Sequence, residues 1–242
     1  MDTWRLITTW GADPAFNMGL DEALLESAEG SPTVRFYSWR PDTLSLGYFQ
    51  RISDVPGIER ASAVVRRITG GGAIHHVKEL TFSIAAQLDH PLYRGPIADS
   101  YARIHEAIRA ALAEVGVPAE IRGARDLVSD RAGTGMCFHK STAIDLVWGE
   151  RKGVGSAQRR KGGRVLHHGS IKLGTSPFEG EIATAGEHAQ GLTAQEFAPV
   201  LRRAFAQGFG ATLEAAVPTP DERSRGKLLG KRYVDPDFVR GR

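Results

Sequence analysis

The sequence predicts an α+β fold, in which a mixed, mostly antiparallel sheet is flanked by helices. Several short segments combine β-branched and aromatic residues, and residues 34–39 (VRFYSW) and 80–87 (LTFSIAAQ) are the clearest. Residues 99–115 and 193–208 instead repeat apolar side chains at the spacing of an amphipathic helix. Strands and helices do not alternate as β-α-β units along the chain, so we expect mainly antiparallel pairing.

In the first half of the chain, short strands surround two helices. The first helix is expected at residues 17–28, with Asp21, Glu22 and Glu26 on the side opposite its apolar residues. The second is the amphipathic segment 99–115. The remaining elements are strands at residues 4–9, 34–39, 43–48, 63–67, 80–87 and 119–121, and a helical turn at 55–60.

The second half is expected to add a hairpin, two further strands and two helices. Residues 143–148 and 152–157 predict a β-hairpin, because Gly149-Glu150 suits a two-residue turn. Thr193 can cap the helix that follows. The other expected elements are strands at residues 164–168, 170–173 and 212–216, a charged helix at 219–229, and a tail from 233 to 242.

Composition places the chain among globular proteins. With 242 residues, of which 41% are hydrophobic and 24% charged, the chain can bury a core as one large domain or two small ones. No apolar run reaches the roughly 18 residues of a membrane span, and the first residues lack the features of a signal peptide. A single cysteine cannot form an internal disulfide, so we expect a cytoplasmic protein with no membrane partner.

The net charge of +3 favours acidic partners. The basic residues form no long tract, and no helix-turn-helix, zinc-binding or RNA-binding signature is present, so we expect no nucleic-acid partner. A small acidic protein would suit the charge equally well.

Cys137 is the first candidate for chemistry. A free cysteine is often a small core residue, but Cys137 ends a polar, glycine-containing loop, which suits an accessible thiol. Lys152 lies in a predicted strand, where an ammonium is costly unless it faces a site or solvent. If the fold brings Lys152 to Cys137, it favours the thiolate and can stabilise an oxyanion; otherwise it is an exposed hairpin lysine.

A glycine-rich stretch, Gly70-Gly71-Gly72, lies upstream between Arg66-Arg67 and two histidines. Three glycines bury no side chain and cost entropy on ordering, which indicates a close backbone approach to a ligand, although a flexible loop is the alternative. The stretch lacks the Gly-Lys-Ser/Thr of a phosphate-binding loop. No His, Cys, Asp or Glu set has zinc-ligand spacing, so no metal is expected.

Two segments resemble one known family. RRITGGGAIHH resembles the Arg-Arg-x-x-Gly-Gly-Gly/Arg-Ala-x-x-His motif of the lipoate–protein ligases and octanoyltransferases, relatives of the biotin–protein ligases. GERKGVGSAQRRKGGRVLHHGSIKL resembles the family's Gly-x-x-Lys-x-x-Gly-Ser-Ala-Gln…His-Gly-Ser motif. The resemblance covers most of the chain. It implies the biotin/lipoate ligase catalytic-domain fold, as a single domain over residues 1–242 without an accessory C-terminal domain.

Within that family, the resemblance favours the cysteine-dependent, ligase-like octanoyltransferases. Cys137-Phe138 matches the position of their nucleophile, and Glu79-Leu80-Thr81-Phe82-Ser83 is similar to their Glu-Leu-Thr-Tyr-Ser. The implied reaction passes an octanoyl group from acyl carrier protein, through a Cys137 thioester, to a lysine of a lipoyl-domain protein. No cofactor is implied, and we expect a monomer.

The resemblance also implies a set of site residues. Cys137 and Lys152 would be catalytic. The substrate-binding residues would be Arg67, Gly70, Gly71, Gly72, Ala73, His76, Gly155, Ser156, Ala157, Gln158, His168 and Gly169.

Two positions depart from the family pattern. Val77 stands where an acidic residue usually follows the motif histidine, and Gly72 is typical of the ligases, since transferases often have arginine there. The first alternative is therefore an ATP-dependent lipoate–protein ligase that forms a lipoyl-adenylate, using ATP and Mg²⁺. The second is a non-catalytic acyl-binding protein.

Overall fold

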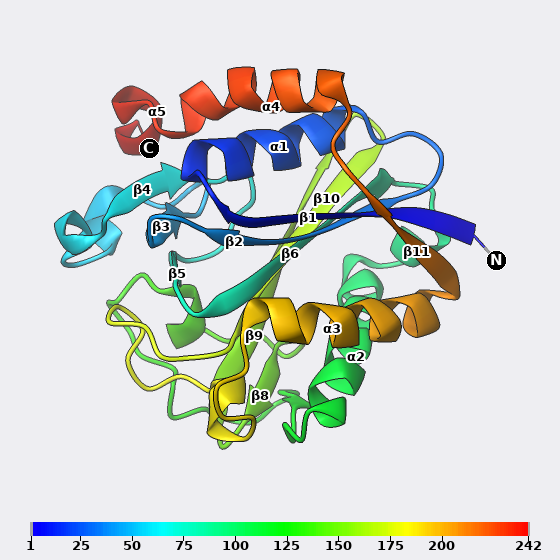
Figure 1. The fold of residues 1–242 in the computed structure, drawn as a ribbon. Helices are drawn as coiled ribbons and strands as arrows, with labels where there is room; N and C mark the ends of the chain where they lie inside the picture. The colour runs from blue at the N-terminus through cyan, green and yellow to red at the C-terminus, as the bar shows by residue number, and fades with distance from the viewer. Residues whose placement is uncertain (1, 242) are drawn as a thin grey trace.

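An eight-stranded mixed sheet forms the centre of the computed structural model, which describes residues 2–241 (Figure 1). Its strand order is β11-β1-β2-β6-β10-β9-β8-β7. β1 pairs in parallel with β11 and β2, and every other neighbouring pair is antiparallel, as the sequence predicts for most of the sheet. The strands are β1 (Asp2–Ala12), β2 (Thr33–Trp39), β6 (Glu79–Gln87), β7 (Glu120–Ile121), β8 (Leu146–Trp148), β9 (Arg151–Lys161), β10 (Arg164–Lys172) and β11 (Ala211–Ala216).

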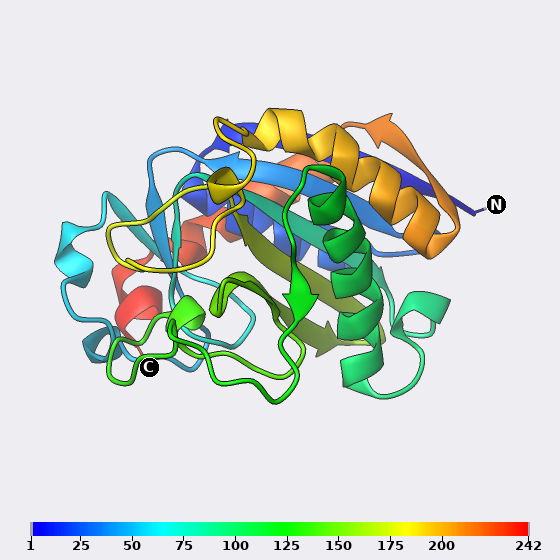
Figure 2. The same ribbon diagram turned by 90° about the horizontal axis from the view of Figure 1, so that it is seen from below.

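Helices cover both faces of this sheet. α1 (Pro14–Glu26) and α4 (Pro220–Tyr233) lie over one face in Figure 1, and α2 (Ile97–Glu114) and α3 (Ala194–Phe209) over the other, where Figure 2 shows them side by side. Because helices cover both faces, β2 is buried on both sides. Phe36 packs in the core beneath α2 and α3, whereas Arg35 bonds to α1 on the opposite face. Within residues 2–241, no helix is both long and apolar enough to cross a membrane.

The N-terminus is an exception to the mostly antiparallel pairing, because β1, α1 and β2 form a β-α-β unit. β1 and β2 are adjacent and parallel, and α1 connects them. Parallel neighbours need a crossover connection, and α1 provides it. The helix begins three residues earlier than expected, because Asp13 caps it and Pro14 occupies its first turn.

α1 is also less exposed than its sequence predicts. Asp21 and Glu22 are buried. Asp21 faces the large sheet, where it contacts Arg35 and Tyr37 of β2, and α4 packs over Glu22. Each carboxylate has a buried partner: Asp21 Oδ1 lies 2.8 Å from Arg35 Nη1, and Glu22 Oε2 accepts a 2.7 Å hydrogen bond from Tyr233. Burial of these charges is tolerable because each is paired.

A second, three-stranded sheet carries the glycine-rich segment. Its order is β4-β3-β5, from β3 (Thr43–Leu46), β4 (Ala63–Arg66) and β5 (Ile74–His76). β5 was not predicted, since three residues give little periodic signal. A Cβ added at Gly47, just after β3, would lie 1.9 Å from the carbonyl oxygen of Gly71. The absence of a side chain at Gly47 therefore lets the two loops pack together.

The C-terminal segment is not an extended tail. It forms α5 (Pro236–Arg240), which packs against β4. The buried Arg66 guanidinium donates to the carbonyl oxygens of Val239 and of Gly47, at 2.6 and 2.8 Å from Nη2 and Nη1. The first arginine of the Arg66-Arg67 pair thus joins the C-terminal helix to the loop that supports Gly71.

The contact between α1 and α4 gives a stability prediction. A Cβ at Gly19 would lie 2.0 Å from the carbonyl oxygen of Gly226 and 2.5 Å from the amide nitrogen of Gly230. Gly19→Ala must separate the helices, and overpacking of this kind costs about 1–3 kcal/mol. We expect a loss of roughly 2–10 °C in Tm by thermal unfolding. Gly70→Ala is the control, because a Cβ there meets nothing within 4 Å; an unchanged Tm in G19A would contradict this packing.

Candidate active site

Two hollows meet at Cys137. The first is a narrow cavity on the α1 side of the sheet, and its lining includes Met18, Trp39 and Ile74. The second is a wider, open groove with a more polar lining. The residues common to both linings are Gly71, Cys137 and Ser156. An apolar chain in the cavity would therefore present its end to the groove beside the thiol.

Cys137 begins a short 3₁₀ turn, Cys137–His139, and is partly exposed. Its backbone is tied to the glycine-rich segment, since its N–H donates to the Ala73 carbonyl at 2.7 Å and the Ala73 N–H donates to Gly135 at 2.8 Å. A Cβ at Gly72 would lie 2.8 Å from the amide nitrogen of Cys137. Gly72 is thus needed for this approach, which gives a local reason for the ligase-like glycine.

Lys152 lies in β9, is buried, and reaches Cys137. Its Nζ is 3.6 Å from Cys137 Sγ and 2.9 Å from Asp145 Oδ2, and it donates to the carbonyl oxygens of Cys137 at 3.0 Å and Lys140 at 3.2 Å. Burial alone would lower the pKa of Lys152, but the facing Cys137 and Asp145 charges outweigh burial and raise it. The ammonium therefore stays charged next to the sulfur.

Gly155 makes room for this pair. A Cβ at this position would lie 2.9 Å from Lys152 Cε and 3.5 Å from Cys137 Sγ. Gly155, Ala157 and Gly169, to which the resemblance assigns substrate binding, all line the cavity. Gln158 does not line it: its amide donates to Ser100 and His167, on the α2 side of the sheet.

Arg67 is buried behind the glycine-rich segment. Its guanidinium donates to the carbonyl oxygens of Gly70 and Gly72, at 2.8 and 2.7 Å, and to the Ser45 carbonyl at 2.9 Å. Burial lowers the pKa of Arg67 to about 10, which still leaves it charged at neutral pH. Arg67 thus fixes the shape of the loop, and both Gly70 and Gly71 face the cavity.

His76 lines the cavity, but both of its ring nitrogens are engaged. Nδ1 donates to Glu79 Oε1 at 2.5 Å, and Nε2 accepts from the Ser45 hydroxyl at 2.8 Å. Burial lowers the pKa of His76 to about 4, so the ring is neutral at neutral pH. The ring also stacks on Trp39, with centroids 4.1 Å apart, and so presents a face to the cavity. The carboxylate of Glu79 thus bonds to the motif histidine, although Val77 stands where the family usually has an acidic residue.

His168 has a similar environment on β10. Its Nε2 accepts from the Thr69 hydroxyl at 2.5 Å, and its Nδ1 lies 3.6 Å from Asp21 Oδ2. Burial lowers the pKa of His168 as well. Both histidines predicted for the site therefore lie at the cavity, and in each the ring nitrogens bond to protein groups.

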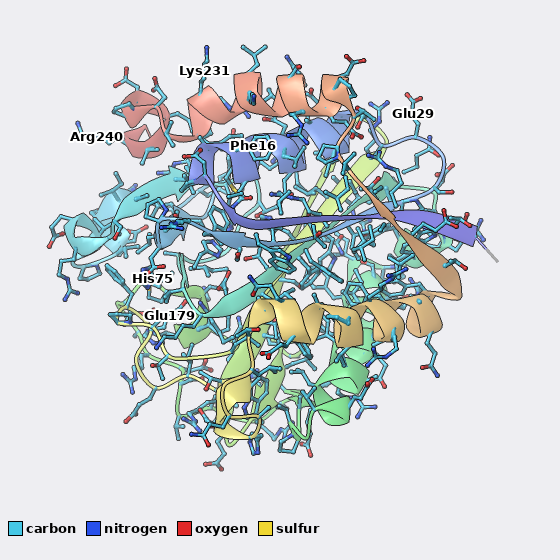
Figure 3. All side chains as sticks on the ribbon, in the orientation of Figure 1. Phe16, Glu29, His75, Glu179, Lys231 and Arg240 are labelled. Atoms are coloured by element: carbon cyan, nitrogen blue, oxygen red, sulfur yellow. The ribbon has the colours of Figure 1, made fainter. Side chains whose placement is uncertain are left out.

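Lys172, Glu79 and Glu179 form a buried ion cluster next to β5. Lys172 Nζ lies 2.9 Å from Glu79 Oε2 and 2.8 Å from Glu179 Oε2. Glu179 comes from the segment after β10, and it lies beside His75 in Figure 3, where its Oε1 accepts from the His75 N–H at 3.3 Å. Lys172 therefore joins two distant segments of the chain beneath β5.

Sequence reasoning missed the residues that act through a partner distant in the chain. Asp145, the counter-ion of Lys152, was visible only as a polar residue in a predicted strand. His105 on α2 bonds to Ser156 and looked like an ordinary polar position. No motif singles out either residue. Among residues 2–241, no group of three or more His, Cys, Asp or Glu side chains could hold a metal ion.

Known proteins similar to this chain are lipoyl ligases and octanoyltransferases. Residues 13–205 match the family model described as the lipoyl protein ligase A/B catalytic domain. The octanoyltransferase LipM of Moorella thermoacetica is 48% identical over 179 residues, which cover 71% of this chain and 66% of that protein. The octanoyltransferase LipM of Kyrpidia tusciae is 34% identical over 272 residues, covering 98% of each chain.

Solved structures share the fold. A lipoate-protein ligase A with bound ATP superposes with a TM-score of 0.81 at 22% identity, covering 100% of this chain and 99% of that one. A bi-partite lipoate protein ligase from Thermoplasma acidophilum gives a TM-score of 0.79 at 21% identity, covering 100% and 97%. The TM-scores show a shared fold.

The contact between Lys152 and Cys137 predicts the reactivity of the thiol. The ammonium lies 3.6 Å from the sulfur and attracts the negative charge that the sulfur carries when it attacks an alkylating agent. Lys152→Met combined with Asp145→Asn removes the charge without leaving a buried carboxylate unpaired. We expect this double variant to react with iodoacetamide at pH 7 about tenfold more slowly. Lys140→Met is the control, because only the backbone of Lys140 contacts the ammonium; equal rates in all three proteins would show that Lys152 does not activate Cys137.

The buried histidines predict how stability depends on pH. Burial lowers the pKa of His76 to about 4 and also lowers the pKa values of His105, His167 and His168. In the unfolded chain these groups take up protons below about pH 6.5. The stability they provide is therefore complete above that pH and is lost as the pH falls towards 4.

We expect Tm to fall steadily between pH 6.5 and 4.5, as measured by thermal unfolding. His188→Gln should leave this profile unchanged, because His188 is exposed. A Tm that is constant over this range would contradict neutral, buried histidines.

Proposed function

The chain belongs to the lipoyl protein ligase A/B catalytic domain family, and we propose that it is an octanoyltransferase of lipoate biosynthesis. It would take the octanoyl group from acyl carrier protein and place it on a lysine of a lipoyl-domain protein. The observation that carries this proposal is the position of Cys137 Sγ, 3.6 Å from the Lys152 ammonium, at the junction of the cavity and the groove. Relatives named octanoyltransferase support the choice of substrate.

In the first half-reaction, the Cys137 thiolate attacks the carbonyl carbon of the donor thioester. The new C–S bond forms at Cys137, and the bond to the donor sulfur breaks, so the donor leaves as a thiolate that takes a proton from water. The octanoyl chain lies in the cavity, where burial of apolar surface favours it. The Lys152 ammonium stabilises the attacking thiolate and the oxyanion that forms.

In the second half-reaction, the neutral amine of the acceptor lysine enters through the groove and attacks the Cys137 thioester. The C–N bond forms, the C–S bond breaks, and the nitrogen loses one proton. The products are an octanoyl amide and a Cys137 thiolate next to Lys152. This sequence uses no nucleotide, cofactor or metal, and a single copy of the chain supplies its residues.

A structure of similar fold supports the choice of acceptor, since it is described as a bi-partite lipoate protein ligase and its E2 lipoyl domain. We therefore assign the acceptor to the lipoyl-domain class and the donor to acyl carrier protein. The open groove, lined by Lys140, Arg131 and other polar residues, is the route by which carrier-borne groups reach the sulfur.

The proposal predicts a covalent acyl-enzyme. Purified protein mixed with octanoyl-acyl carrier protein, without ATP, should gain the mass of one octanoyl group by intact-mass spectrometry. The gain should disappear on treatment with hydroxylamine, which cleaves thioesters. Cys137→Ala should show no gain and should lose octanoyl transfer to a lipoyl domain by more than about 1000-fold.

The alternatives predict different results. An ATP-dependent ligase would modify the lipoyl domain from free lipoate or octanoate and ATP, and C137A would retain this activity. A non-catalytic acyl-binding protein would bind octanoate tightly and form no product under either condition. Either outcome would replace the transferase proposal.

A further inference from the structure

Ser156 lines the same two hollows as Cys137. It is the one hydroxyl-bearing residue among the three described residues that line both the cavity and the groove, with Gly71 and Cys137. The thioester carbonyl on Cys137 and the nitrogen that attacks it must meet at this junction. Ser156 is partly exposed, and its hydroxyl lies on the α2 side of the sheet, within hydrogen-bonding distance of His105.

The direction of the hydrogen bond between Ser156 and His105 follows from its neighbours. The Nδ1 of His105 contacts the carbonyl oxygen of Ile144, which can only accept, so Nδ1 carries the proton. Burial lowers the pKa of His105, so at neutral pH its other nitrogen is unprotonated. Nε2 lies 2.7 Å from Ser156 Oγ and must accept from it. The hydroxyl proton therefore points to His105, and an oxygen lone pair remains for the junction.

The second half-reaction requires a group that takes the proton from the attacking amine. Lys152 is a charged ammonium and cannot accept. His76 and His168 also accept from hydroxyls, those of Ser45 and Thr69, but both of these oxygens already accept from Arg67. Both hydroxyl residues are fully buried, whereas Ser156 Oγ has no second partner among residues 2–241.

His139 and Thr134 form a similar pair that lines the groove. Thr134, however, does not line the cavity, and its hydroxyl already accepts from the Met136 N–H. It is therefore not placed at the junction where the acyl carbonyl lies.

We propose that Ser156 and His105 form a proton relay for amide formation. The inference rests on the proposed function, because it assumes a thioester on Cys137 and a lysine acceptor. As the C–N bond forms, the nitrogen gives its proton to Ser156 Oγ while Ser156 passes its own proton to His105 Nε2. The C–S bond then breaks, and His105 returns the proton through Ser156 to the Cys137 thiolate or to water. Ser156 contacts the substrate, and His105 acts through it.

The groups around His105 allow a transient positive charge. Asp145 lies on the loop before β8 and raises the pKa of His105, whereas Lys152 on β9 lowers it. Tyr101, one turn earlier on α2, contacts the ring edge-on at 6.0 Å. His167 on β10 is also nearby, and burial keeps it neutral. The carboxylate and the Ile144 carbonyl thus stabilise the imidazolium, which can then release the proton.

Separate measurement of the two half-reactions tests the relay. The octanoyl-enzyme is prepared with octanoyl-acyl carrier protein, isolated, and mixed with a lipoyl-domain acceptor under single-turnover conditions. Thioester exchange needs no base, so Ser156→Ala should slow self-acylation much less than it slows amide formation. Amide formation at pH 7 should slow about 10- to 100-fold, at the lower end of general-base effects. Ser156→Thr, which keeps the hydroxyl, should restore most of that rate.

The pH profile separates a relay from a structural role. The ratio of wild-type to S156A rates should be largest near neutral pH and fall towards one in acid, where His105 becomes protonated. His105→Gln should reproduce this loss, because its amide cannot take up the proton. Equal slowing of both half-reactions, or a ratio that does not change with pH, would overturn the relay. Failure of the wild type to acylate itself would instead overturn the proposed function.

Discussion

The Lys152 ammonium is the interaction on which the site depends. It is buried, and four protein groups surround it: the Cys137 sulfur and carbonyl, the Lys140 carbonyl and the Asp145 carboxylate. A lone buried ammonium would be costly or would lose its proton. Here Asp145 and Cys137 keep it charged, and the two carbonyl contacts hold the 3₁₀ turn of Cys137 against β9. The same ammonium therefore stabilises the conformation of the loop and places a positive charge next to the sulfur.

β9 explains how one strand serves several roles. Lys152 reaches the sulfur, Gly155 leaves space for both groups, and Ser156 faces α2 and His105. Opposite it, Arg67 holds the glycine-rich segment open and Gly72 allows the Cys137 turn to approach. The site is thus the contact between the large sheet and the small one, and α5 secures the small sheet through Arg66.

The pattern of apolar residues along the chain predicted those helices and strands that depend on neighbouring residues. Alternation and helical spacing were sufficient for β2, β6, α2 and α3. The sequence marked Cys137 and Lys152 as candidates, but only the fold shows that they are in contact. Parallel pairing of β1, burial of Asp21 and docking of α5 depend on partners distant in the sequence, which no local pattern contains. For the same reason, the sequence indicated His76 and His168 as site residues but not the hydrogen bonds that their rings make to the hydroxyls of Ser45 and Thr69.

The most direct test of the account is whether the acyl-enzyme is kinetically competent. Octanoyl-enzyme freed of donor would be mixed rapidly with excess lipoyl domain, and the loss of the thioester and the gain of amide would be followed by quenched-flow mass spectrometry. An intermediate on Cys137 predicts that both occur together, at a rate no slower than steady-state turnover. A thioester that persists while the complete reaction turns over would contradict the account.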